Sequence, residues 1–133
     1  MCKNMALSER AMALKTDLQA VLADKRELEA IEQEWRDLLL FEDVLDELSD
    51  GELPMVSELF HERQALRKQL AIHQLKNWAV LQHFTGTGLQ RRLLRLRYIR
   101  GLPWTAIFET LDFSKQHVMR EHNKALESLA KRR

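Results

Sequence analysis

Residues 101–118 read GLPWTAIFETLDFSKQHV, and this stretch has the signals of two short helices separated by a tight turn. A Gly-Leu-Pro run ends the preceding segment, and residues 104–111 then offer one or two turns of helix. Asp112 and Phe113 make the turn, where Asp can adopt left-handed backbone geometry at modest cost. Ser114 is a favourable N-cap, because its hydroxyl can accept a hydrogen bond from an amide of the next helix. The stretch therefore predicts helix, turn and helix.

The helix after this turn is expected to run to about residue 131, and a helix over residues 89–100 precedes it. The inward side of the last helix consists of apolar residues at helical spacing: Val118, Ala125, Leu126 and Leu129. Its outward side is polar and basic, and consists of Lys115, Gln116, Met119, Arg120, Asn123 and Lys124. A short helix, a turn and a longer helix with such an outer face are typical of helix-turn-helix proteins, whose second helix enters the major groove of DNA.

The two ends of the chain differ in charge, although the 133 residues together have a net charge of +1. Residues 1–85 hold 10 Lys and Arg against 16 Asp and Glu, a net charge of −6. Residues 86–133 hold 11 Lys and Arg against 4 Asp and Glu, a net charge of +7. A basic surface attracts polyanions, whereas an acidic one repels them. We therefore expect a polyanion partner for the C-terminal part.

The acidic part has the pattern of two long amphipathic helices, over residues 6–48 and 55–84. Apolar residues recur every three or four positions in the first, with a small phase shift at Leu28. Residues 49–54, Ser-Asp-Gly-Glu-Leu-Pro, interrupt the pattern, so the two helices form a long antiparallel, coiled-coil-like hairpin. A helix of about forty residues extends about 60 Å. That length favours a hairpin that dimerises or binds another protein; the alternative is a hairpin that only covers the C-terminal domain.

Residues 85–88, Thr-Gly-Thr-Gly, form a second break, where the sign of the charge changes. A phosphate-binding loop is the alternative for the two glycines, but no strand precedes them and no lysine follows the second one. We therefore expect a hinge there, with an acidic helical hairpin at 1–85 and a basic domain at 86–133.

Residues 94–129 contain, in order, Arg-Tyr-Ile, Gly-Leu-x-Trp, Ser-x-x-His-Val-x-Arg-x-His and Ala-Leu-x-x-Leu. This spacing is similar to region four of bacterial sigma factors. The whole layout resembles the small phage and prophage transcriptional regulators of the RinA and ArpU kind. The resemblance implies a sequence-specific DNA-binding regulator of phage or prophage type, which either recruits RNA polymerase or represses by occlusion.

The resemblance also implies roles for individual residues. It assigns base reading to the start of the last helix, at Lys115, Gln116, Met119 and Arg120. It assigns DNA phosphate contacts to Arg95, Arg97, Arg100, Thr105, Ser114 and Lys124. For the three arginines and Lys124, internal salt bridges are the alternative. Phe108 stands where such units usually have a small residue, so it should open the angle between the two helices or point into a groove that another chain fills.

Other patterns argue against an enzyme, a metal site or a membrane protein. Cys2 is the only cysteine, which excludes an internal disulfide and a cysteine-based zinc site and fits a reducing cytoplasm. His117 and His122 are five residues apart and point to different sides of a helix, so they do not form a metal site. The longest uncharged stretch has about ten residues, half of what a bilayer crossing needs. We expect no catalysis, no cofactor, no metal and no membrane partner, and a cytoplasmic location.

We therefore expect an all-α protein that binds double-stranded DNA through the basic domain and forms a homodimer through the hairpin. Two alternatives stay open. A small-terminase-like DNA-packaging protein also joins a helix-turn-helix to long helices, although its DNA module usually comes first. A sigma mimic or antagonist would act by protein–protein interaction, and the acidic hairpin and Phe108 favour that reading.

Overall fold

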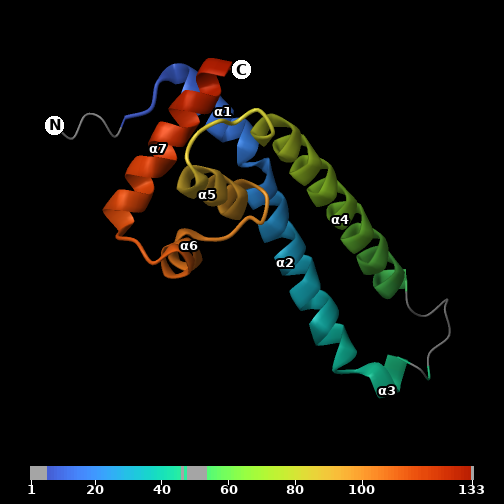
Figure 1. Cartoon of the computed structure of the whole chain (residues 1–133). Coiled ribbons are helices and arrows are strands. Elements are labelled where there is room, and N and C mark those ends of the chain that lie inside the picture. The colour runs from blue at the N-terminus through green and yellow to red at the C-terminus, as the bar shows by residue number, and fades with distance from the viewer. Residues whose placement is uncertain (1–5, 46, 48–53, 133) are drawn as a thin grey trace. The chain divides into compact units, whose positions relative to one another are not determined.

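The computed structural model describes residues 6–45, 47 and 54–132, and all regular structure in these ranges is helical (Figure 1). These ranges contain seven helices: α1 (Glu9–Leu18), α2 (Ala20–Leu39), α3 (Glu42–Leu45), α4 (Pro54–Leu81), α5 (Gly88–Tyr98), α6 (Trp104–Leu111) and α7 (Lys115–Arg132). The all-α prediction is confirmed for this part of the chain. Most of the predicted break at 49–54 lies outside the described residues. Pro54 is the first residue of α4, a position where its missing amide hydrogen costs nothing.

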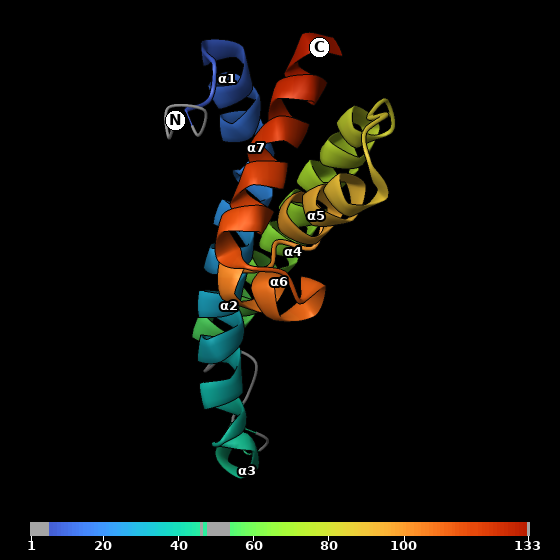
Figure 2. The ribbon, with the colours of Figure 1, turned by 60° about the vertical axis from the view of Figure 1, so that its left-hand side comes forward.

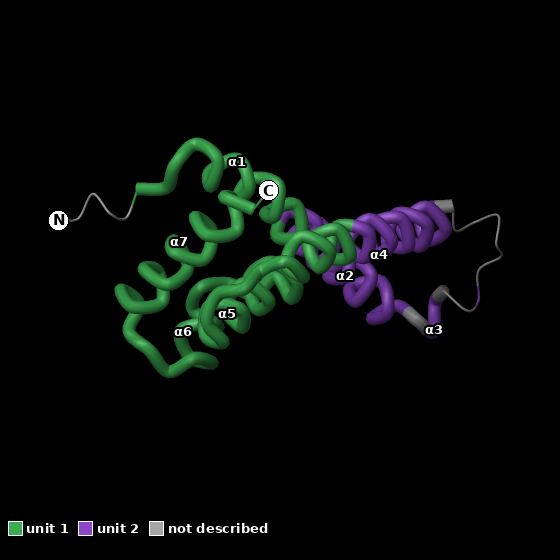
Figure 3. The backbone as a smooth tube through the Cα atoms, turned by 45° about the horizontal axis from the view of Figure 1, so that its top comes forward, with its two compact units in different colours: residues 1–22, 73–133 green, residues 23–72 purple. Residues whose placement is uncertain are grey.

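The chain divides into two compact units, and α2 and α4 each contribute to both (Figure 3). Unit 1 comprises residues 1–22 and 73–133, and unit 2 comprises residues 23–72. The expected boundary at residue 85 lies inside unit 1, because α1 and the end of α4 share a hydrophobic core with α5 and α7. This division enlarges the charge difference. Unit 2 has 6 Lys and Arg against 14 Asp and Glu, net −8, and unit 1 has 15 against 6, net +9.

The larger core of unit 1 is built around α7, which lies against α1 and α5 (Figures 1 and 2). The buried residues of α7 are Val118, His122, Ala125, Leu126, Leu129 and Ala130, and the last four belong to this core. They include all four residues that the sequence places on the inward side. From the other helices the core takes Ala11, Leu14, Leu18, Leu81, Leu94 and Tyr98.

The N-terminal helix is interrupted, and the continuous helix expected over residues 6–48 is therefore wrong. α1 ends at Leu18, where the hydrogen bonds of the backbone depart from the helical pattern. The amide of Leu22 donates to the carbonyl of Gln19 (3.0 Å), and the carbonyl of Leu18 accepts from Nδ2 of Asn77 (3.0 Å). A side chain of α4 thus supplies a partner to the end of α1. A second interruption separates α2 from α3.

Two amide side chains of α4 fix the end of α5. Nδ2 of the buried Asn77 also donates to the carbonyl of Tyr98 (2.7 Å), and Nε2 of Gln74 donates to the carbonyl of Ile99 (2.8 Å). The last carbonyls of a helix have no partner within it, so these bonds satisfy groups that burial would otherwise penalise. Gly101 follows with a φ of 66°, a conformation that favours glycine, and lets the chain turn toward α6.

In unit 2 the segments of α2 and α4 are antiparallel, because contacts pair early residues of one with late residues of the other. Nε2 of Gln69 donates to Oδ1 of the buried Asp24 (2.6 Å). At the other end, the rings of Trp35 and Phe60 lie 6.2 Å apart. Side-chain contacts thus join the two helices at both of these places.

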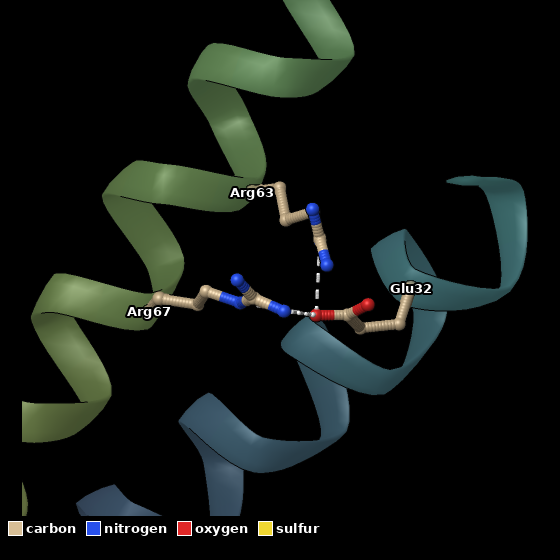
Figure 4. Close-up of polar contacts among 3 residues, drawn as sticks. All are labelled: Glu32, Arg63 and Arg67. Atoms are coloured by element: carbon tan, nitrogen blue, oxygen red, sulfur yellow. Dashed lines mark hydrogen bonds and ion pairs between the residues drawn. The ribbon is translucent and has the colours of Figure 1, made fainter. Parts of the chain in front are cut away.

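Along the two helices, an ionic cluster of Glu32, Arg63 and Arg67 lies between these two contacts. Figure 4 shows its three side chains. Oε1 of Glu32 accepts from Nε of Arg63 (3.1 Å) and from Nη2 of Arg67 (2.9 Å). The pKa of Glu32 lies below its usual value, mainly because of the hydrogen bond from Arg63. The guanidinium of Arg63 also lies 5.2 Å from the centre of the Trp35 ring. Two of the few cations of unit 2 are thereby held on one carboxylate.

Candidate nucleic-acid interface

The basic region begins with the N-terminus of α5, which two side-chain hydrogen bonds cap. Oγ1 of Thr87 accepts from the amide of Gln90 (3.1 Å), and Oε1 of Gln90 accepts from the amide of Thr87 (3.3 Å). This capping box satisfies two of the amides that α5 leaves without helical partners. A Cβ at Gly86 would collide with the side chains of Phe84 and Gln90. The segment expected to be a hinge thus supplies the N-cap and the first residue of α5, and close packing accounts for its first glycine.

The predicted helix, turn and helix are present at the predicted residues. α6 ends at Leu111, and Asp112 follows in the left-handed conformation (φ 54°, ψ 39°), with its amide donating to the carbonyl of Phe108 (3.1 Å). Oγ of Ser114 accepts from the amide of His117 (3.1 Å), which is the predicted cap of α7. Local turn chemistry thus fixes where α7 begins.

A second core cluster holds α5, α6 and α7 together. It consists of the buried Leu93, Leu96, Ile107, Leu111 and Val118. Phe108 packs on this cluster and stacks on Trp104, with ring centres 6.0 Å apart and planes at 20°. Its ring is thus accommodated by its own chain. The Nζ of Lys115 lies 5.9 Å from the centre of the Phe108 ring, which joins the first residue of α7 to α6.

The first half of α7 carries one row of exposed polar side chains. Gln116, Arg120 and Lys124 follow one another at intervals of four and are all exposed, so they share one face of the helix. Nζ of Lys124 lies 3.3 Å from Oε2 of Glu121, and the Lys124 side chain is still 61% exposed. This row lies on the side away from the buried residues of α7 and can contact a ligand along two turns.

The other two predicted base-reading residues lie in a neighbouring row. Lys115 is exposed, but its ammonium group is near the Phe108 ring. Met119 is only partly exposed. The structure therefore brings two of the four predicted base readers, Gln116 and Arg120, onto the most open face.

The predicted phosphate-binding residues fall into two groups. Arg95, Arg100, Thr105, Ser114 and Lys124 are exposed. The Arg95 guanidinium lies 5.0 Å from the centre of the Trp78 ring. Arg97 differs, because its Nη1 donates to the carbonyl of Leu102 (2.9 Å) and its guanidinium lies 4.5 Å from the centre of the Trp104 ring. Arg97 thus braces the link between α5 and α6.

Two further cations of α5, Arg91 and Arg92, are exposed and are absent from the predicted set. The signal that could have found them is their place before Leu93 and Leu94, which are both buried. Helical spacing then turns the two arginines outward. With Arg95, they make the outer face of α5 basic.

A buried polar pair, Tyr98 and His122, joins α5 to α7. The hydroxyl of Tyr98 lies 2.7 Å from Nε2 of His122, and Nδ1 of His122 lies 3.1 Å from Oδ1 of Asn123. Since Oδ1 can only accept, Nδ1 carries the proton and Nε2 accepts from the tyrosine. Burial lowers the pKa of His122 to about 4 and raises the pKa of Tyr98 well above its usual value. His122 is therefore a neutral core residue.

The described residues contain neither a cluster of metal-ligating side chains nor a helix that could cross a membrane. Nowhere in these residues do three or more His, Cys, Asp or Glu side chains gather as a metal ion would need. None of the described helices combines the length and the apolar character that a membrane crossing requires.

Comparison of the chain with protein-family models, with curated proteins and with solved structures gives no match. The resemblance to region four of sigma factors therefore stays a prediction.

Proposed function

We propose that the protein is a sequence-specific DNA-binding transcriptional regulator in which α6 and α7 act as a helix-turn-helix. The observation that carries the proposal is the exposed row of Gln116, Arg120 and Lys124 on a helix that is capped at its start and buried on its other side. The major groove is about 12 Å wide and accepts one such helix. The first turns of α7 would then lie against base edges.

The residue types in this row suit base reading. Arg offers two donors to O6 and N7 of guanine, and Gln pairs with N6 and N7 of adenine. Arg120 and Gln116 are the candidates for these contacts, with Lys115 and Met119 beside them. An apolar Met119 would contact a thymine methyl group rather than a hydrogen-bonding edge.

The rest of unit 1 supplies the attraction to phosphate. Its net charge is +9, and exposed cations lie on both α5 and α7. The amides at the start of α7 add a partial positive charge of the kind that binds phosphate at helix N-termini. Such contacts hold a protein in register on the duplex without reading its sequence. Binding should therefore weaken steeply with salt.

The regulatory part of the proposal follows from the resemblance. A regulator of phage or prophage type would act in the cytoplasm, either by recruiting RNA polymerase or by blocking a promoter. A homodimer formed through the α2–α4 hairpin would double the DNA footprint and fix the spacing of two half-sites.

Selection from a randomised double-stranded DNA library tests the proposal. The full-length protein is compared with Arg120→Ala and with the matched control Lys131→Ala, which removes an exposed cation about 16 Å further along the same helix. The proposal predicts one enriched motif for the wild type and for Lys131→Ala, and no motif for Arg120→Ala. Sequence-blind binding by all three proteins, lost near physiological salt, would contradict it.

A further inference from the structure

Unit 2 contains a groove with an apolar floor. The groove has a volume of about 410 Å³ and lies between the end of α2 and the start of α4. Its floor consists of Leu38, Phe41, Met55 and Leu59. Leu59 is buried, whereas Phe41 and Met55 are 59% and 61% exposed. Large apolar side chains with this exposure, gathered at one place, are typical of interaction surfaces.

The rim of the groove is acidic. Its four charged residues are Glu34, Asp37, Glu58 and Glu62, and the described lining includes no Lys or Arg. Asp37 accepts a hydrogen bond from Nε2 of Gln33 (2.9 Å), a neutral donor that leaves its charge in place. Four carboxylates around an apolar floor attract a cationic ligand and repel an acidic one.

We propose that this groove binds an amphipathic helix of another protein, with an apolar face in the groove and Lys or Arg along its edges. A groove between two helices accepts a third helix through apolar residues at positions i, i+3, i+4 and i+7. Basic residues beside that apolar face would then meet the carboxylates of the rim. The proposal concerns unit 2 alone and does not depend on DNA binding by unit 1.

A second copy of the chain is a poor ligand for this groove. The most basic helices, α5 and α7, would have to leave the cores of unit 1 before their apolar faces could enter it. The helix α4 does expose Ile72 and Leu75 beside Lys68 and Lys76, but its entry into the groove of a second copy would be a head-to-tail contact, which builds open chains or rings rather than a closed dimer. The charge complementarity therefore favours a different protein as the partner.

Fluorescence anisotropy with a labelled peptide tests the charge requirement. The probe is a helical peptide with Leu at positions i, i+3, i+4 and i+7 and Lys on both flanks, and the protein is the full-length chain. We expect saturable binding that Glu58→Lys with Glu62→Lys weakens about tenfold or more, since two attractions become repulsions. The matched control is Glu27→Lys with Glu29→Lys, which changes the net charge equally at exposed sites outside the groove lining and should retain most of the affinity.

A second pair of variants tests the apolar floor. Phe41→Ala with Met55→Ala removes two largely exposed side chains, so the fold is preserved, and should also weaken the peptide about tenfold. Absence of binding, equal binding of a peptide with Glu in place of Lys, or unchanged binding by the groove variants would overturn the proposal. So would sedimentation showing that the chain self-associates and that Phe41→Ala with Met55→Ala abolishes the association, because the groove would then be an interface between copies.

Discussion

The two units of this protein differ in how they use their apolar residues. The largest fully buried side chains all belong to unit 1, where most of them form two clusters. Among the described residues of unit 2, Ile31 and Leu59 are the buried apolar side chains, while Leu40, Phe41 and Met55 are more than half exposed. Unit 1 therefore presents its charged side chains on a packed core, whereas unit 2 leaves large apolar side chains exposed.

The largest effect on stability should come from the core of unit 1. Leu126 is completely buried, so Leu126→Ala should lower the free energy of unfolding by about 3 to 4 kcal/mol through lost burial and a cavity. Leu40→Ala is the matched change in unit 2, where the side chain is 81% exposed, and should have little effect. Urea denaturation followed by circular dichroism measures both. Similar losses in the two variants would remove the difference between the units.

Acid should destabilise unit 1 through His122. Burial lowers the pKa of His122 to about 4, whereas the ordinary pKa in the unfolded chain is about 6.5. Between these pH values the unfolded chain therefore binds one proton more than the folded chain at this residue. The free energy of unfolding should fall as the pH drops from about 6.5 to 4, by up to about 3 kcal/mol from this residue. Urea titrations across this range should give a flatter pH dependence for His122→Gln than for the wild type.

The control for this change is His117→Gln, on the same helix and partly exposed. It should keep the pH dependence of the wild type. If His122→Gln kept that dependence too, another group would be responsible for it.

Asn77 should have the next largest effect, because it joins three helices of unit 1. Asn77→Ala leaves the carbonyls of Leu18 and Tyr98 without the amide donor, which should cost about 2 kcal/mol. Thermal unfolding, compared with the exposed neighbour Lys76→Ala, measures this cost. A loss no greater than that of Lys76→Ala would mean that the two hydrogen bonds of Asn77 contribute little to the stability of unit 1.

The ionic cluster of unit 2 should have the smallest effect. Glu32 and Arg63 are partly exposed and Arg67 is about half exposed, so Glu32→Gln should change the free energy of unfolding by less than about 1 kcal/mol. The effect should shrink further at high salt. Urea denaturation at low and high salt checks both expectations, and a loss as large as that of Leu126→Ala would show that unit 2 depends on this cluster.

Local features of the fold could be read from the sequence. The limits of α6, the left-handed turn at Asp112 and the cap by Ser114 depend on neighbouring residues, and the sequence predicts all three correctly. The interruption after Leu18 could not be predicted in this way. It involves a hydrogen bond from Asn77, 59 positions away, which no local pattern reveals.

In the candidate interface, too, the sequence predicts what depends on local spacing and not what depends on the path of the chain. Helical spacing correctly turns Gln116 and Arg120 outward, because both lie opposite the apolar residues of α7. For Arg97, as for Arg95 and Arg100, the sequence leaves a phosphate contact and an internal partner open. The structure gives Arg97 internal contacts with the carbonyl of Leu102 and the ring of Trp104, and these depend on how the chain turns after α5.

Base discrimination by Arg120 is the most direct test of whether α7 reads DNA. After a motif has been selected, competition binding compares that site with a scrambled duplex for the wild type, Arg120→Ala and Lys131→Ala. We predict that Arg120→Ala loses about 1–3 kcal/mol of discrimination, roughly a fivefold to 150-fold change, and that Lys131→Ala loses almost none. Equal discrimination by Arg120→Ala and the wild type would contradict the account, because the exposed row of α7 would then not read DNA.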